Sequence, residues 1–164
     1  MDEQISIIAL IISFLSLGMS FYFWRCQFRP IVTVSVRTVS GGNTAIAYAL
    51  HVMNSGSIPA KDIQIVFNGD SVEQALGQDS TEENKTRWVR SINENPIFLL
   101  QNGDTTTCSF GTSQANDQGF WKYGSEIILN LKYKGWFGYT YKETQKIKIQ
   151  DSESFTGYMW NPNA

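Results

Sequence analysis

The chain begins with a long apolar run. Residues 5–24 read ISIIALIISFLSLGMSFYFW and include no charged side chain. A helix of this length, at about 1.5 Å per residue, matches a bilayer hydrocarbon core of about 30 Å. The run therefore predicts a transmembrane helix over 5–24 after a short tail over 1–4. Its acidic start at Asp2 and Glu3 and the absence of a small-residue cleavage site argue against a cleaved signal peptide.

Beyond Pro30 the pattern changes to a strict alternation of apolar and polar residues. Pro30 disfavours helix at the residue before it, so 25–30 is interpreted as a juxtamembrane linker. Val32, Val34 and Val36 then share one face of a strand at 31–40. Strand patterns return at 44–54, 60–68, 97–100, 105–110, 125–134 and 139–150. About seven short strands separated by turns predict an all-β soluble domain, an antiparallel immunoglobulin-like β-sandwich over 31–150.

Neighbouring strands are expected to pair in chain order. The first three look antiparallel, 97–100 and 105–110 form a candidate hairpin, and 125–134 with 139–150 form the clearest one. Residues 69–95 are polar and predict a long loop with one helical turn near 71–76. The aromatic C-terminal tail over 151–164 is expected to pack along a sheet edge through its large apolar residues, Phe155, Tyr158, Met159 and Trp160.

Composition narrows the possible chemistry. The net charge of −2 and pI near 5.4 make nucleic-acid binding an unfavoured function. His51 is the one histidine, and Cys26 and Cys108 are the two cysteines, which leaves no zinc-ligand spacing and no histidine-based catalytic group. We therefore expect a protein that is not an enzyme, with no catalytic residue, no metal site and no cofactor.

The charges that flank the apolar run indicate an orientation. Arg25, Arg29 and Arg37 follow the run, and no lysine or arginine precedes it. The positive side of a membrane helix faces the cytoplasm. The sandwich is thus predicted to be cytoplasmic.

Small residues recur along the apolar run at spacings of three and four. They are Ser6, Ala9, Ser13, Ser16 and Ser20. On a helix they form one stripe, and such stripes let two membrane helices approach closely. The stripe predicts self-association of the helix, and the alternative is that common small residues align by chance.

A basic and aromatic group occurs in the polar segment. Lys85, Arg87 and Arg90 surround Trp88, a combination that can hold a phosphate and stack a base, with Lys132 and Lys134 as possible neighbours. This combination makes a small nucleotide a candidate ligand. The alternative is that Trp88 covers the core.

Two large aromatic residues stand at the tip of the last hairpin. Trp136 and Phe137 lie between glycines, where exposed rings are unusual. They are expected to contact lipid headgroups or a partner, or else to pack on the end of the sandwich. Tyr158 and Trp160 of the tail are candidate docking residues in an oligomer.

One short motif carries a resemblance. Asn54-Ser55-Gly56-Ser57-Ile58-Pro59-Ala60, followed by Asp62-Ile63-Gln64-Ile65, resembles the N-x-G-x-x-P-A turn and strand of immunoglobulin-like CARDB-type bacterial domains. Asn54 and Gly56 are expected there to accept left-handed turn conformations. The whole chain resembles small bacterial single-pass membrane proteins of uncharacterised function. The resemblance implies a fold and an interaction role, and it implies no catalytic residue.

These observations favour a membrane-anchored binding or scaffolding protein of the bacterial inner membrane. Its expected partners are the lipid bilayer, a second copy of the chain and an unidentified protein. The alternative is a ligand-gated membrane effector, in which a small anionic or nucleotide signal bound by the β domain drives membrane perturbation.

Overall fold

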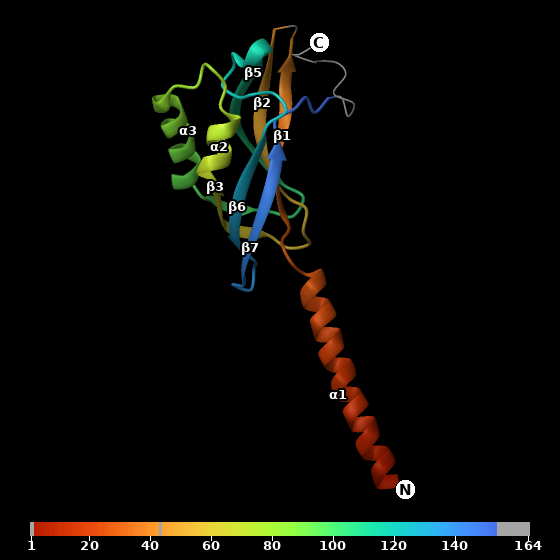
Figure 1. Ribbon diagram of the computed structural model, residues 1–164. Coiled ribbons are helices and arrows are strands. Elements are labelled where there is room, and N and C mark those ends of the chain that lie inside the picture. The colour runs from red at the N-terminus through yellow and green to blue at the C-terminus, as the bar shows by residue number, and fades with distance from the viewer. Residues whose placement is uncertain (1, 43, 154–164) are drawn as a thin grey trace.

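A long helix projects from a β-rich body (Figure 1). The structure, a computed structural model, describes residues 2–42 and 44–153. Helix α1 (Asp2–Gln27) is exposed at each position from 4 to 27, and over Gln4–Gln27 it is long and apolar enough to span a membrane. The linker predicted over 25–30 is thus partly wrong. Pro30 disfavours helix only at Arg29, and the Phe28 N–H still donates to the Trp24 carbonyl at 2.9 Å.

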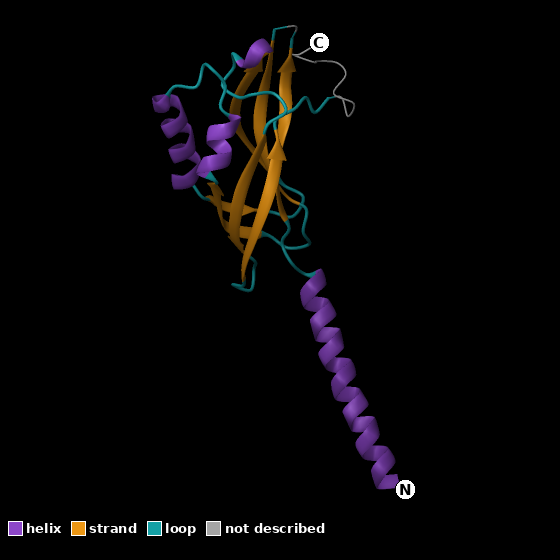
Figure 2. Cartoon of the chain, in the orientation of Figure 1, coloured by secondary structure: helices purple, strands orange, loops and turns teal. Residues whose placement is uncertain are grey.

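The body is a two-layer antiparallel β-sandwich (Figure 2). Its strands within the described residues are β1 (Val32–Gly41), β2 (Ala45–Asn54), β3 (Ala60–Phe67), β4 (Ile97–Leu100), β5 (Thr105–Gln114), β6 (Glu126–Lys134) and β7 (Thr140–Lys148). One sheet has the order β1-β2-β5 and the other β4-β3-β6-β7. The all-β class, the seven strands and the antiparallel pairing agree with the sequence.

The core lies between the sheets and is formed by the inward-facing residues of the alternating strands. Its buried apolar residues include Val32, Val34, Ile46, Leu50, Ile63, Ile65, Phe110, Trp121, Ile127, Leu129, Leu131 and Tyr133. Along one edge the sheets are joined by Gln145 of β7, whose side chain donates to the Val32 carbonyl (2.7 Å) and accepts from the Val34 N–H (3.0 Å). This link holds β1 and β7 together where no ladder joins the two sheets.

Strand order differs from the simplest expectation at two places. β3 pairs with β6 and β4 rather than with β2, and β4 and β5 belong to different sheets, so the predicted 97–110 hairpin is wrong. The four-residue connection after β4 crosses between sheets, because the Gly103 N–H and the Asp104 carbonyl bond the backbone of Asn54 in β2. Nearest-neighbour pairing cannot reveal such a crossover. The β6–β7 hairpin is confirmed, with Lys134 opposite Thr140.

Two helices connect β3 to β4. Helix α2 (Gly69–Ala75) matches the expected helical turn, and Asn68 caps it by accepting from the Ser71 N–H at 3.0 Å. Helix α3 (Glu82–Glu94) stands where we predicted loop, and that prediction is wrong. Its signals are a Thr81 N-cap, acidic residues in the first turn, charge pairs four residues apart and a short apolar stripe of Trp88, Val89 and Ile92.

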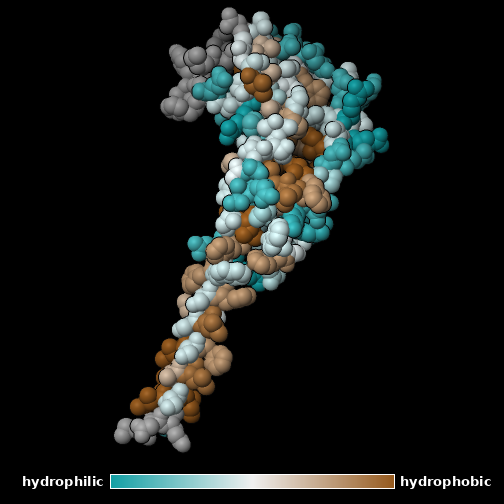
Figure 3. Space-filling model, turned by 180° about the vertical axis from the view of Figure 1, so that it is seen from behind, coloured by the Kyte–Doolittle hydropathy of each residue, from teal (hydrophilic) through white to brown (hydrophobic). Residues whose placement is uncertain are grey.

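The sandwich continues slightly past its predicted end at 150. Asp151 is buried and accepts a hydrogen bond from the Thr38 hydroxyl at 2.8 Å. The residues expected to pack as a tail, including Tyr158 and Trp160, lie outside the described residues. In Figure 3, brown and tan residues predominate along α1, whereas polar colours predominate on the body.

Candidate functional site

The aromatic residue of the predicted nucleotide site belongs to the core. The ring of Trp88, on α3, lies 4.8 Å from that of Phe67, 5.2 Å from that of Phe110 and 5.0 Å from that of Trp121. Its indole N–H is buried and finds no hydrogen-bond partner among the described residues. Trp88 therefore covers one end of the sandwich core, as the alternative interpretation held, and a base could stack on it only if α3 moved.

The cations around Trp88 are paired with carboxylates. Lys85 bonds Glu73 and lies 3.0 Å from Glu82, and these hydrogen bonds, Glu73 first, raise the pKa of Lys85. Two further ion pairs, Arg87–Glu83 and Arg90–Glu94, each measure 3.1 Å. An anionic ligand would have to displace these carboxylates.

The two β6 lysines do not join this group. Lys132 and Lys134 are exposed on β6, and Lys134 pairs with Asp62 of β3 at 3.0 Å. Within the described residues no hydrogen bond or ion pair connects either of them to α3. The structure thus gathers three of the five predicted cations.

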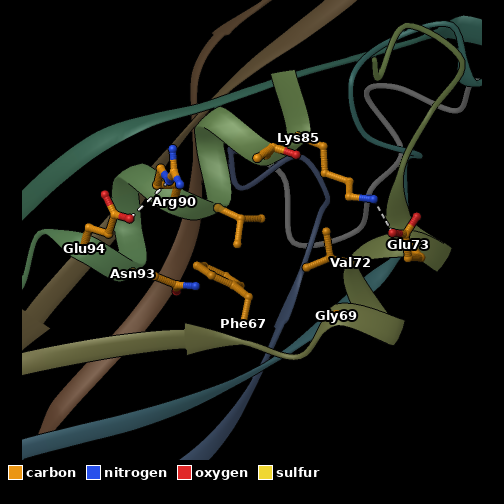
Figure 4. A pocket seen from close by; sticks show the side chains of 10 residues that line it. Phe67, Gly69, Val72, Glu73, Lys85, Arg90, Asn93 and Glu94 are labelled. Carbon is orange, nitrogen blue, oxygen red and sulfur yellow. Dashed lines mark hydrogen bonds and ion pairs between the residues drawn. The ribbon is translucent and has the colours of Figure 1, made fainter. Parts of the chain in front are cut away.

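A groove of about 370 Å³ lies between α2 and α3 (Figure 4). Phe67 and Val72 form part of its apolar floor, and two ion pairs, Lys85–Glu73 and Arg90–Glu94, stand at its rim. The rim charges cancel, so the groove offers no net positive charge to attract a phosphate. The nucleotide-gated function stays a prediction.

A second cavity, of about 330 Å³, lies between the sheets under the end of α3. Leu50, Ile63 and Ile97 line it, and Cys108 lies at its wall. The alternation along β5 predicts that Cys108 faces inward as a small hydrophobe. It does face inward, but it is exposed because β5 is an edge strand, and the surrounding protein atoms still desolvate the thiol enough to raise its pKa. A raised pKa makes Cys108 a weak nucleophile.

Aromatic side chains gather where α1 meets the body. We call this group the collar: Trp24, Phe28, Trp136, Phe137 and Tyr139. The ring of Trp24 lies 5.6 Å from Phe28 and also 5.6 Å from Phe137, in the turn between β6 and β7. Figure 1 shows this turn at the same end of the body as α1. Residues more than a hundred positions apart in sequence therefore form one aromatic surface.

Two cations complete the collar. The Arg25 guanidinium lies 4.1 Å from the centre of the Tyr139 ring, and the Lys61 ammonium 3.8 Å from that of Trp136. Trp136 is 58% exposed and Phe137 56%, so these rings are held out from the sandwich rather than packed on it. The sequence pointed to Trp136 and Phe137, but it gave no sign that Lys61 or α1 would lie beside them.

The turn that holds these rings is tight. The Gly135 N–H donates to the Tyr139 carbonyl at 2.9 Å, and the Gly138 N–H donates to Gly135 at 3.1 Å. Gly138 has φ 79°, a left-handed conformation that glycine adopts without strain. The turn therefore presents its aromatic residues on a fixed backbone.

The N-x-G motif fastens α1 to the sandwich. The Ser57 hydroxyl donates to the Gln27 carbonyl at 2.7 Å, and the Ser57 N–H to that of Arg29 at 3.2 Å. A Cβ on Gly56 would lie 2.4 Å from the Arg29 carbonyl oxygen. Gly56 is thus needed for close approach, and our expectation of a left-handed conformation is wrong, since its φ is not positive.

The small-residue stripe lies on α1 and is exposed. Ser13 donates its hydroxyl proton to the Ala9 carbonyl at 2.9 Å, within the helix. Ser6, Ser16 and Ser20 occupy the same element. Self-association through this stripe stays a prediction.

Residues 4–153 match a family described as a domain of unknown function (DUF8453). The chain belongs to this family. The match includes α1 as well as the sandwich, so the helix is part of the unit that members share. No curated protein matches the chain. The relationship to CARDB-type immunoglobulin-like domains therefore stays a hypothesis.

Proposed function

We propose that this protein is a single-pass membrane protein whose β-sandwich is a binding module held upright on the bilayer surface. Helix α1 crosses the membrane, and the collar lies at the headgroup level. The apolar length of α1 and the exposed rings of the collar support this proposal. Tryptophan and tyrosine are enriched at this depth because their rings are apolar and their N–H and O–H groups reach water.

The contact between Trp24 and Phe137 carries the proposal. Trp24 ends the apolar run, so in a spanning helix it lies near one membrane surface. Phe137, whose ring centre is 5.6 Å away, is then at the same depth, and the turn over 135–139 touches the same layer of lipid. The basic side chains of Arg25 and Lys61 suit contact with anionic headgroups.

Two attachments give the sandwich a fixed orientation. The helix provides one and the β6–β7 turn the other, so the domain cannot swing freely on a flexible tether. The rest of its surface is presented to other proteins at a defined height above the bilayer. The flanking arginines favour the cytoplasmic face of a bacterial inner membrane for this domain.

Fluorescence quenching by brominated phospholipids tests the lipid contact. The full-length protein is reconstituted in vesicles, and wild type is compared with Trp136→Phe and, as a matched control, Trp88→Phe. We expect Trp136→Phe to remove a strongly quenched component and Trp88→Phe to remove an unquenched one, because Trp88 is enclosed by core rings. Equal quenching losses in the two variants would contradict lipid contact by the turn.

A further inference from the structure

Lysines cover the outer face of the β6–β7 hairpin. We call this group the lysine face: Lys132, Lys134, Lys142, Lys146 and Lys148. They are exposed and alternate with inward residues such as Leu131, Tyr133 and Ile147, so all five project from one side of the sheet. This local positive charge stands out in a chain whose net charge is −2.

The lysine face includes a repulsive pair. Lys132 lies directly opposite Lys142 in the antiparallel ladder, and like charges in that position repel. Lys134 pairs with Asp62, but among the described residues no carboxylate forms an ion pair with the other four. Glu143, the nearest acidic residue on β7, points inward and accepts from the Tyr133 hydroxyl at 2.8 Å. On the same face Glu126 stands opposite Lys148, and lysines on an edge strand such as β7 also discourage pairing with another chain. The repulsion between Lys132 and Lys142 is left uncompensated, and an anionic partner would relieve it.

The bilayer is not the partner that fits the whole face. Strand β7 runs from the collar end of the body toward the end opposite α1 (Figure 1). Lys134 and Lys142 lie near the collar end, whereas Lys148 lies at the far end of the strand. Headgroups at the level of Trp24 therefore reach only the collar end of the lysine face.

We propose that the lysine face binds an extended acidic segment of a partner protein. This rests on the proposed function and names the chemistry of its partner. Alternate residues of a strand repeat at about 6.8 Å, the spacing at which an extended chain presents its own alternate side chains. Carboxylates on such a segment pair with Lys142 and Lys146, and Val66 beside the row, 48% exposed, offers an apolar contact.

Nucleic acid fits this face less well. A long polyanion would meet the negative charge of the rest of the chain, and single-stranded binding relies on rings that stack with bases. The residues that share the face with the lysines include Gln64, Val66, Glu126, Ile128, Asn130 and Thr144, and none of these is aromatic. A short acidic protein segment meets neither obstacle.

Binding of a fluorescein-labelled polyglutamate peptide tests the proposal. The full-length protein is held in phosphatidylcholine nanodiscs, and wild type is compared with Lys142→Glu/Lys146→Glu and with Arg37→Glu on the other sheet. We expect binding that weakens with salt, a loss of at least about tenfold in the lysine variant, and wild-type affinity in the control.

Thermal unfolding separates a binding defect from misfolding. Because Lys142→Glu replaces repulsion from Lys132 by attraction, the variant should unfold at the same or a higher temperature while it loses the peptide. Absence of peptide binding, equal binding by the lysine variant, or tighter binding of a single-stranded oligonucleotide of equal charge would each overturn the proposal. Quenching is measured in parallel with the same proteins in nanodiscs of brominated phosphatidylcholine, so loss of the membrane contact is recorded independently of peptide binding.

Discussion

At the residue scale, Asn54 connects more of the fold than any other polar side chain described above. It is fully buried, and its oxygen accepts from the N–H groups of Ile31 (3.2 Å) and Gly56 (3.0 Å). Its amide nitrogen donates to the carbonyls of Ile58 (2.8 Å) and Leu100 (3.2 Å). One residue therefore joins the start of β1, the motif turn and the end of β4, all beside the junction with α1.

Replacing Asn54 by alanine should be strongly destabilising. Four backbone groups, two of them in buried and two in partly buried hydrogen bonds, lose their partner, and we expect a loss of about 3 kcal/mol in the free energy of unfolding, measured by thermal or chemical denaturation in detergent. Asn130→Ala is the matched control, since Asn130 is exposed and accepts one bond, from Thr144. A loss for Asn54→Ala no larger than that for Asn130→Ala would contradict this account.

Alkaline stability should depend on Tyr48. Burial is the largest effect on this phenol and raises its pKa to about 12 from 10.0, against a smaller opposing effect of the neighbouring Ser113 side chain. The folded state thus holds the proton more tightly than the unfolded state. The contribution of protonated Tyr48 to the free energy of unfolding is therefore fully present below about pH 10. It is lost as the pH rises through the folded-state pKa, and the loss amounts to about 2–3 kcal/mol between pH 10 and 12.

Tyr48→Phe checks this pH dependence. Unfolding free energies of the variant and of wild type are compared at pH 8 and at pH 11. The variant should be nearly as stable as wild type at pH 8 and lose less at pH 11. Tyr133, whose pKa is also raised, chiefly by burial, will keep part of the alkaline loss in both proteins. An identical loss in both would show that Tyr48 does not titrate as its burial requires.

At the element scale, the sequence predicts those elements whose apolar and polar residues alternate regularly. Strands such as β1 and β6 alternate between core and solvent, so their positions and inward faces are readable from the chain. Helix α3 is harder to read, because it buries none of its residues fully and its apolar stripe is only three residues, Trp88, Val89 and Ile92, within a polar segment. Which sheet a strand joins is not readable, since β3 and β4 are placed by contacts distant in sequence.

Helix α3 should depend on a single side chain. Trp88→Ala removes the ring that packs on Phe67, Phe110 and Trp121, and we expect a loss of about 2–4 kcal/mol with faster amide exchange over 82–94. Arg87→Ala, which breaks an exposed pair with Glu83, should change stability by less than about 1 kcal/mol. Slow exchange over 82–94 in Trp88→Ala would show that other contacts hold the helix.

At the scale of the whole molecule, the collar is the feature that the sequence reveals least. Trp136 and Phe137 are noticeable in the chain as exposed rings beside glycines, yet their meeting with Trp24 depends on the direction in which α1 leaves the sandwich. That direction is set by Ser57 and by the close approach at Gly56. Composition and periodicity describe single segments, so they predict the anchor and the sandwich but not how the two are joined.

The account as a whole requires that α1 spans a bilayer with the sandwich on the cytoplasmic side. The two cysteines can report on this arrangement, because both are exposed in the structure. Cys26 lies in the last turn of α1, at the membrane boundary, and Cys108 lies on β5 of the sandwich. Labelling with a membrane-impermeant maleimide in right-side-out and inverted bacterial membrane vesicles, with detergent as reference, is the most direct measurement. We predict that Cys108 reacts in inverted but not in right-side-out vesicles, and that Cys26 reacts slowly in both kinds of vesicle and rapidly in detergent. Rapid labelling of Cys26 in intact vesicles, or of Cys108 from the outer side, would contradict the account.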